Sequence, residues 1–346
     1  MAGNTAEALR RIQENKRTKS KILDLSGLGL TELPEELWDC VWVEELGLGH
    51  YWSWNGEKEN WILEYDDAKI ANRLSSLPNS ISKVKHLNKL YLDDNPINDI
   101  SVLINLVNLT NLSLNSTSIS DISVLNSLVN LTDLSLSSTS ISDISMLSSL
   151  VNLNYLYLSS TSISDISVLS SLVNLTSLSL SFTSISDISV LSSLANLTNL
   201  YLSFTSISDI SMLGSLVNLR NLSLSSTSIS DISALSSLVN LTNLSLSSTS
   251  ISDISMLSSM VNLTNLSLSS TSISDISVLS SLVNLTTLDL SESSIAYFPF
   301  DLLFLPKVEY LNLQDTHCLN IPSELTHKSN ALLDLKNYYA DLEKNA

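Results

Sequence analysis

The chain has 346 residues, two cysteines, five tryptophans and a formal net charge of −18. That length is enough for two or three globular domains, but a 22-residue period along most of the chain indicates one elongated domain. The negative charge disfavours nucleic acid and anionic membranes as partners, because both need a basic footprint.

The N-terminal segment, positions 1–20, predicts a capping helix. Asn4, with Glu7 three residues later, is a typical helix start, and Ala8, Leu9 and Ile12 form an apolar face. Basic residues gather in the same region, between positions 10 and 21. This charge is expected to lie on a solvated helix face.

The sequence favours a cytoplasmic location. No apolar core of signal-peptide length is present near residue 1. No stretch approaches the roughly 18 consecutive apolar residues that a membrane span needs. Cys40 and Cys318 lie near opposite ends of the chain, so we expect two reduced thiols and no disulfide between them.

An insertion interrupts the early part of the chain. Residues 49–73 separate Leu48 from Leu74 and include several aromatic and acidic side chains. A long aromatic loop in a compact domain is usually functional or packed on itself. It is therefore a secondary binding candidate, with a self-packed flap as the alternative. Its candidate residues are Tyr51, Trp52, Trp54 and Trp61.

A 22-residue repeat fills the centre of the chain. Its first leucine recurs ten times, from Leu87 to Leu285, and the consensus begins N-L-T-N-L-S-L-S-S-T-S-I-S-D-I-S. Alternation around Leu112 and Leu114 predicts a short strand, and apolar residues three apart then predict a 3₁₀ return path. This period and pattern indicate a leucine-rich-repeat solenoid. Each repeat buries its leucines only against its neighbours.

Two positions of the repeat are suited to stabilise its turns. An aspartate recurs from Asp99 to Asp275, and it is placed to accept backbone N–H groups where a short helical turn begins. Thr117 and its equivalents replace the asparagine that Asn95 keeps. We expect their hydroxyls to bond the backbone of the next repeat.

The C-terminal residues predict a second cap. Leu332, Leu335, Tyr339 and Leu342 form one helical stripe suited to the open end of the core. The predicted fold is thus an α/β leucine-rich-repeat arc with a parallel sheet on the concave face, 3₁₀ or extended segments on the convex face and about thirteen turns. Its segments are an N-terminal capping helix at 1–20, the repeats at 21–325 and a C-terminal capping helix at 326–346.

Both flanks resemble the leucine-rich region of bacterial Roco-type proteins. The residues that carry this resemblance are L-D-L-S-G-L-G-L-T-E-L-P-E-E-L, ending at Leu37, and Ile321–Leu325 with the following A-L-L-D-L. In that family a helix joins the repeats to a Ras-like GTPase domain. The chain has no G-x-x-x-x-G-K-[ST] phosphate loop, so no GTPase activity is expected. The central repeats resemble those of internalins, although a signal peptide and a wall anchor are not expected here.

Catalysis finds little support in the sequence. The four histidines, His50, His86, His317 and His327, pair with no cysteine or carboxylate at a metal-binding spacing. The repeated serines have no histidine near them. We expect no enzyme, no cofactor, no metal and no small-molecule substrate.

A binding surface remains, and it is expected on the concave face. Most repeats present Asn and Ser there, but four consecutive repeats break the consensus, and interface energy concentrates in Tyr, Trp and Arg. The alternative is drift among duplicated repeats. The residues of this predicted patch are Tyr155, Tyr157, Phe182, Tyr201, Phe204 and Arg220.

The resulting prediction is a non-enzymatic cytoplasmic scaffold that binds a protein or peptide partner, with no contact to nucleic acid or membrane. A preformed array loses little conformational entropy on binding. Two alternatives remain open, a regulatory segment of a Roco-type GTPase system and an exported internalin-like adhesin. A Ser/Thr face that orders ice is disfavoured by the curvature of the sheet.

Overall fold

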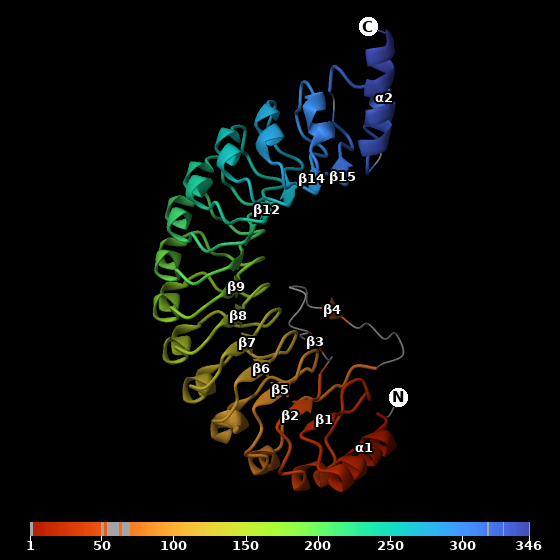
Figure 1. Cartoon of the computed structure of the whole chain (residues 1–346). Coiled ribbons are helices and arrows are strands. Elements are labelled where there is room, and N and C mark those ends of the chain that lie inside the picture. Colours follow the sequence, from red (N-terminus) through yellow and green to blue (C-terminus); the bar gives the residue numbers. More distant parts are fainter. Residues whose placement is uncertain are drawn as a thin grey trace. The chain divides into compact units, whose positions relative to one another are not determined.

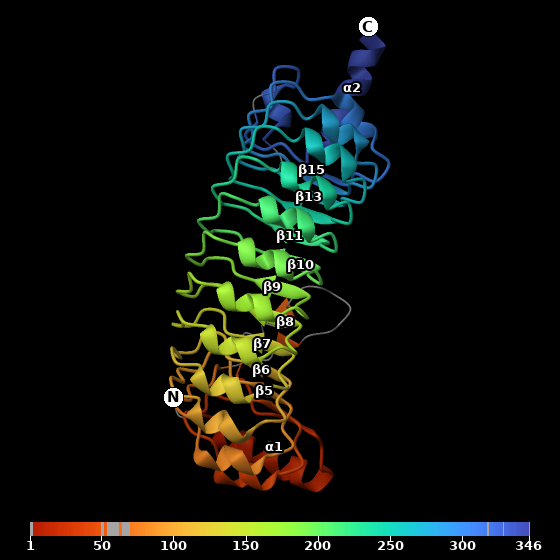
Figure 2. The ribbon, with the colours of Figure 1, turned by 90° about the vertical axis from the view of Figure 1, so that its left-hand side faces the viewer.

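The computed structural model describes residues 3–49, 52–53, 62–63, 70–316, 318–327 and 329–345. These form two compact units, Met1–Leu175 and Thr176–Ala346. Within each unit every repeat contributes a short strand to one side and a 3₁₀ helix to the other (Figure 1). The strands take the concave side of each unit and the 3₁₀ helices take the convex side, which faces the viewer in Figure 2.

The first unit begins with helix α1 (Thr5–Thr18) and contains a parallel sheet. The strands of that sheet, in spatial order, are β1 (Ile22–Asp24), β2 (Glu45–Gly47), β5 (Lys89–Tyr91), β6 (Asn111–Ser113), β7 (Asp133–Ser135) and β8 (Tyr155–Tyr157). Strands β3 (Trp52–Ser53) and β4 (Ile62–Leu63) form a separate antiparallel pair. The 3₁₀ helices are η1 (Glu35–Asp39), η2 (Asn79–Lys83), η3 (Ser101–Asn105), η4 (Ser123–Ser127), η5 (Ser145–Ser149) and η6 (Ser167–Ser171).

The second unit repeats the same pattern and ends with helix α2 (Leu332–Asn345). Its parallel strands are β9 (Ser177–Ser179), β10 (Asn199–Tyr201), β11 (Asn221–Ser223), β12 (Asn243–Ser245), β13 (Asn265–Ser267), β14 (Thr287–Asp289) and β15 (Tyr310–Asn312). The 3₁₀ helices are η7 (Ser189–Ser193), η8 (Ser211–Ser215), η9 (Ser233–Ser237), η10 (Ser255–Ser259), η11 (Ser277–Ser281), η12 (Phe300–Phe304) and η13 (Ser323–Leu325). The repeat fold is therefore the predicted one, with thirteen parallel strands among the described residues.

The period of the sequence creates the core. In one repeat Leu109, Leu112 and Leu114 are at most 2% exposed, and so are the three-apart residues Ile119 and Ile122. Burying one such side chain contributes about 1.5–3 kcal/mol relative to leaving it in water. The return path of each repeat is too short for an α-helix, so the chain closes the repeat with one 3₁₀ turn.

The aspartate column caps these 3₁₀ helices, as predicted. Asp121 Oδ1 accepts a hydrogen bond of 2.8 Å from the Ser123 backbone N–H, and Asp165 does the same for Ser167. This N–H bond is the main reason that the pKa of each carboxyl lies below its usual value. The carboxylates therefore order the corners of the convex side.

The threonine column behaves differently from the prediction. Thr117 Oγ1 donates to the Leu114 carbonyl, three residues earlier in its own repeat, at 2.7 Å. Asn95 does link repeats, because its Oδ1 accepts from Leu74 N–H and its amide donates to the Leu48 carbonyl. The threonine hydroxyls thus bond a carbonyl of their own repeat, whereas Ser293, at the same position of a later repeat, donates to the Leu268 carbonyl of the preceding repeat at 2.8 Å.

Asparagine side chains join successive repeats near the start of each strand. Asn130 Nδ2 donates to the Val107 carbonyl at 2.8 Å, and Asn240 Nδ2 donates to the Val217 carbonyl at 2.9 Å. These residues belong to Asn-Leu-Thr triplets that formally match a glycosylation signal. Their repeated contact explains the triplets as a structural device.

The two end helices cover their units to different extents. Glu7 N–H donates to Asn4 Oδ1, as the predicted cap requires, and Ala8 and Ile12 are fully buried. The C-terminal helix α2 is less buried than α1, because most residues of its predicted apolar stripe are partly exposed.

In α2 only Leu335 of that stripe is fully buried, and Leu332 and Tyr339 are half-buried. The prediction was wrong for Leu342, which is 43% exposed. Helix α2 continues to Asn345, well beyond the turn that holds Leu335. Because each residue of an α-helix advances the chain along the axis, the last turns of α2 run past the core that the helix covers.

Candidate partner-binding surfaces

The six residues of the predicted patch divide between the two units. Tyr155 and Tyr157 lie in β8 of the first unit. The others belong to the second unit, where Tyr201 ends β10 and Arg220 directly precedes β11. Each group is therefore described on its own unit.

Phe182 and Phe204 form a stacked pair in the second unit. Their ring centroids are 4.3 Å apart and the rings are inclined by only 10°. The side chains are 55% and 51% exposed. They occupy equivalent positions, two residues after the last inward leucine of their strands, so the 22-residue period itself places one ring over the next. We call this the phenylalanine pair.

The backbone conformation of the phenylalanine pair is also uncommon for large side chains. Both residues have φ near +58°, in the left-handed region. Serine occupies the same left-handed position in several other repeats, for example Ser160 and Ser226. Positive φ is unfavourable for a bulky side chain. Two adjacent repeats thus hold large apolar rings where both backbone conformation and water disfavour them.

The Asn and Ser side chains along the strands of the second unit form hydrogen bonds with one another, and we call them the polar carpet. Asn221 Nδ2 donates to Asn199 Oδ1, and the same amide contact continues through Asn243 to Asn265. A parallel ladder of serine hydroxyls includes Ser225 and Ser245, 2.6 Å apart. These groups already satisfy one another, so a partner gains little by bonding them. Residues that depart from this polar pattern are therefore the better candidates for contact with a partner.

The first unit has an acidic strand face that the sequence analysis did not single out. Burial raises the pKa of the Tyr91 phenol, and the charges of Glu45, Asp133 and Asp93 raise it further. Burial also raises the pKa of Asp133, partly offset by its bond from Thr132 and by the nearby Lys89. The signal was present in the sequence, since Tyr91 falls where the repeat has serine.

Asp93 is the most buried of these carboxyls, at 1% exposure. Its Oδ1 accepts from the Ser113 hydroxyl and from Asn115 N–H, but its Oδ2 is buried without a hydrogen-bond partner in the described part of the chain. Burial raises the pKa of Asp93 to about 6.

Most of the insertion candidates cannot be placed. Tyr51, Trp54 and Trp61 lie outside the described residues, and for Trp52 only the backbone, in β3, is described. The prediction that these aromatic residues form a second binding site therefore remains a prediction.

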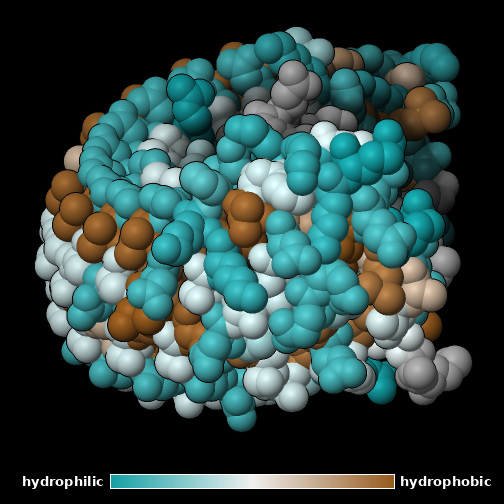
Figure 3. Space-filling model, turned by 90° about the horizontal axis from the view of Figure 1, so that it is seen from below, coloured by the Kyte–Doolittle hydropathy of each residue, from teal (hydrophilic) through white to brown (hydrophobic). Residues whose placement is uncertain are grey.

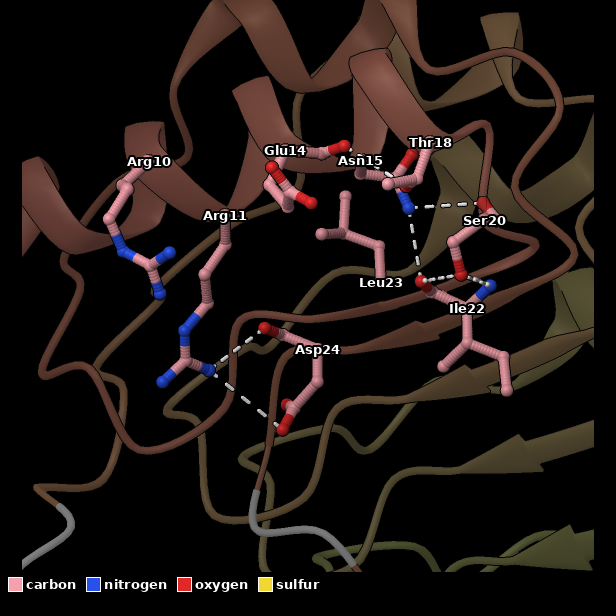
Figure 4. Close-up of a pocket in the computed structure, with 9 residues that line it drawn as sticks. All are labelled: Arg10, Arg11, Glu14, Asn15, Thr18, Ser20, Ile22, Leu23 and Asp24. Atoms are coloured by element: carbon pink, nitrogen blue, oxygen red, sulfur yellow. Dashed lines mark hydrogen bonds and ion pairs between the residues drawn. The ribbon is translucent and has the colours of Figure 1, made fainter.

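A pocket lies between α1 and β1 (Figure 4). Side chains of α1 enter it and bond the outer edge of the strand, where Asn15 Nδ2 donates to the Ile22 carbonyl and Arg11 Nη1 to the Asp24 carbonyl, both at 3.0 Å. Asn15 Oδ1 also accepts from the Trp42 indole. These bonds let α1 cover the exposed edge of the sheet, so we interpret the pocket as part of the N-terminal cap.

Exposed valines recur just before the strands in most of the central repeats, with Ala195 as an exception. Val129, Val151, Val239 and Val261 are each 45–46% exposed. In the end-on view of Figure 3, hydrophobic atoms form separate patches among hydrophilic ones. Scattered half-exposed apolar residues are normal on a protein surface.

Three further observations limit the chemistry. Among the described residues no group of three or more His, Cys, Asp and Glu side chains is arranged to hold a metal ion. No helix in this same part of the chain has the length and apolar character of a membrane span. Cys40 and Cys318 are free thiols, and burial raises the pKa of both.

Comparison with known families identifies the repeats. Overlapping segments from residue 130 to residue 281 match the model described as Leucine Rich repeats (2 copies). No curated protein sequence matches the chain.

Several solved structures share the fold. An internalin from Listeria monocytogenes is 28% identical, with 94% of this chain and 93% of that chain covered and a TM-score of 0.79. A leucine-rich-repeat protein of Leptospira interrogans is 22% identical, with 92% and 94% covered and a TM-score of 0.65. A plant peptide hormone receptor, RGFR1, in complex with RGF2, is 18% identical, with 92% and 55% covered and a TM-score of 0.64. The chain has the leucine-rich-repeat fold.

Proposed function

We propose that the chain is a non-enzymatic scaffold that binds a protein or peptide partner through the strand side of its repeats. The phenylalanine pair carries this proposal. Its rings are about half exposed and lie on left-handed backbone, so Phe182 and Phe204 occupy positions that are unfavourable for a bulky apolar side chain and where serine is the consensus. Features that are unfavourable for folding concentrate at functional positions.

Aromatic side chains also have the energetic capacity for this role. Truncating a buried aromatic residue at the centre of an interface typically costs about 2 kcal/mol or more. The pair is pre-organised by its own stacking, so little rotamer freedom is lost on binding. The self-bonded carpet around it gives the polar, energetically neutral surroundings that such contact sites have.

The other aromatic residues extend the proposal within their own units. Tyr201 lies in β10, on the same unit as the pair, and Tyr155 and Tyr157 offer a separate aromatic surface on β8. A peptide partner is supported by the plant receptor of the same fold, which was solved in complex with RGF2.

The test compares capture of partners by the full chain and by variants. Proteins cross-linked to wild type in an extract of the native cells are identified by mass spectrometry, and the affinity of the purified candidate is measured. The double variant Phe182→Ser/Phe204→Ser should lose at least about a hundredfold in affinity. Val217→Ser/Val239→Ser removes half-exposed apolar side chains from the same unit and should bind as wild type does. Equal binding by both double variants contradicts the proposal.

We further propose a cytoplasmic location, which two buried, unpaired thiols support. The second candidate is an exported adhesin, favoured by the 28% identity to an internalin over most of both chains. A role beside a Roco-type GTPase rests only on the flanking motifs around Leu37 and Ile321. Fractionation of the native cells decides between the first two, because recovery at the cell surface contradicts the cytoplasmic proposal.

A further inference from the structure

Near-identical repeats leave the position of a bound partner along the strands undefined, because every repeat presents the same surface. In the second unit the amide ladder from Asn199 to Asn265 presents the same groups once per repeat. A partner that recognised only this carpet would fit equally well after a shift of one repeat. Specific binding therefore needs residues that occur once. The phenylalanine pair is one such feature, and Arg220 is a second.

Arg220 departs from its surroundings in chemistry. It replaces the threonine found at Thr198 and Thr242, and no other lysine or arginine occurs between Lys89 and Lys307. The side chain is exposed. Among the described residues nothing accepts a hydrogen bond from its guanidinium or forms an ion pair with it, whereas Arg10, Arg11 and Arg17 are all paired with glutamates.

An unpaired guanidinium has a preferred ligand. Its planar fork of N–H donors matches a carboxylate, and such charge-assisted contacts are among the stronger hydrogen bonds. The chain carries a net charge of −18, so a polyanionic partner is repelled. Arg220 instead suits a single carboxylate on a partner that is otherwise neutral or basic.

The repeat fixes the spacing between the two features. Arg220 directly precedes β11, and Ser226 occupies in that repeat the position that Phe204 occupies in the one before. An offset of about six residues at about 3.3 Å each places the two positions no more than about 20 Å apart along the strand direction. An extended peptide segment of about five or six residues spans that distance.

We propose that the second unit binds an extended segment of its partner at two points, with an apolar side chain on the phenylalanine pair and a carboxylate on Arg220, separated by at most about five residues of extended chain. This inference rests on the proposed function and adds the chemistry and spacing of the ligand. The carboxylate belongs either to an Asp or Glu side chain or to the C-terminus of the partner. Arg220 sets the register, and the phenylalanine pair supplies most of the affinity.

The test uses a library of random decapeptides panned on the full chain. Wild type should select peptides with an aromatic or large apolar residue and a carboxylate at one fixed spacing of at most about five residues. Arg220→Thr, which restores the repeat consensus, should retain the apolar preference and lose the carboxylate preference, with at least about a tenfold loss of affinity for the selected peptides. In the Arg220→Thr background, Thr242→Arg should restore the carboxylate preference with a changed spacing.

Synthetic peptides separate the sources of the carboxylate. Amidating the C-terminus weakens binding if the chain end is recognised, and Asp→Asn or Glu→Gln substitution weakens it if a side chain is recognised. An unchanged carboxylate preference in Arg220→Thr overturns the inference while leaving the proposed function intact. Absence of any apolar consensus on wild type overturns both.

Discussion

Asp93 Oδ1 accepts a hydrogen bond of 3.0 Å from the backbone N–H of Asn115, the residue at its own position in the next repeat. Asn115 Oδ1 in turn accepts from Ser137 N–H at 2.9 Å. The same hydrogen bond between neighbouring repeats is thus accepted by a carboxylate at Asp93 and by an amide at Asn115. The carboxylate differs in its second oxygen, because Oδ2 of Asp93 is buried without a partner in the described part of the chain.

Asp93→Asn should therefore stabilise the protein at neutral pH. Burial raises the Asp93 pKa from 3.8 to about 6 in the folded state, so the carboxyl favours folding below pH 3.8 and this contribution is lost as the pH rises through about 6. A shift of this size corresponds to about 2–3 kcal/mol. The amide keeps the acceptor and removes the charge.

Thermal melts at two pH values check this prediction. The variant should melt above wild type at pH 7.5, and the two should converge near pH 4, where the wild-type carboxyl is protonated. Asp94→Asn, at the neighbouring half-buried position, is the control and should show a smaller difference at both pH values. A gap between variant and wild type that is equal at both pH values contradicts the titration of Asp93.

Reverting the phenylalanine pair should not weaken the fold. Phe182→Ser/Phe204→Ser restores the residue found at the left-handed position in most repeats, which adopts the same positive φ there, and it removes two rings that are about half exposed to water. The loss is limited to the stacking between the rings. Urea unfolding should give a midpoint equal to or above that of wild type. A clearly lower midpoint shows that the pair is structural.

The C-terminal cap should depend on one residue of its stripe. Leu335 is fully buried. Leu335→Ala should therefore destabilise the second unit by about 2–5 kcal/mol and promote aggregation. Leu342 is 43% exposed. Leu342→Ala should change stability only slightly, as substitutions at exposed positions usually do. Light scattering during a thermal ramp separates the two, and similar behaviour of both variants would show that the cap extends to the end of α2.

The threonine column should contribute through hydrogen bonds within each repeat. Thr205 is 7% exposed, and its hydroxyl donates to the Leu202 carbonyl at 2.7 Å. Thr205→Val keeps the shape and removes this bond, which should cost about 1 kcal/mol. Chemical denaturation measures the loss. Ser206→Ala, at an exposed neighbouring position, should leave stability unchanged.

The sequence predicted the features that depend on period. Leucine spacing determines which side chains are buried, and the aspartate of each repeat accepts from the N–H two residues later, as at Ser123. It did not predict the bond of Thr117, because a hydroxyl at this position can bond a carbonyl of its own repeat, as Thr117 does, or one of the preceding repeat, as Ser293 does, and the pattern treats the two alike. It also missed the left-handed backbone of Phe182 and the position of Leu342 beyond the core, since both depend on three-dimensional packing.

The acidic face around Tyr91 was missed for another reason. It combines residues from three different repeats, and no single repeat looks exceptional. Comparing equivalent positions, Tyr91 with Ser113 and Asp133 with Asn111, would have revealed it. The location of the partner site, by contrast, remains a prediction.

The link between Asn240 and the Val217 carbonyl recurs at Asn262 and Asn284 with an unchanged distance of 2.9 Å. Each junction within the regular part of a unit therefore has the same donors, acceptors and apolar contacts as the next. Deleting or duplicating one whole repeat should therefore join surfaces that already fit. Recombination between these near-identical segments would change the length of the array in steps of one repeat, and it would change how many repeats separate Arg220 from each end.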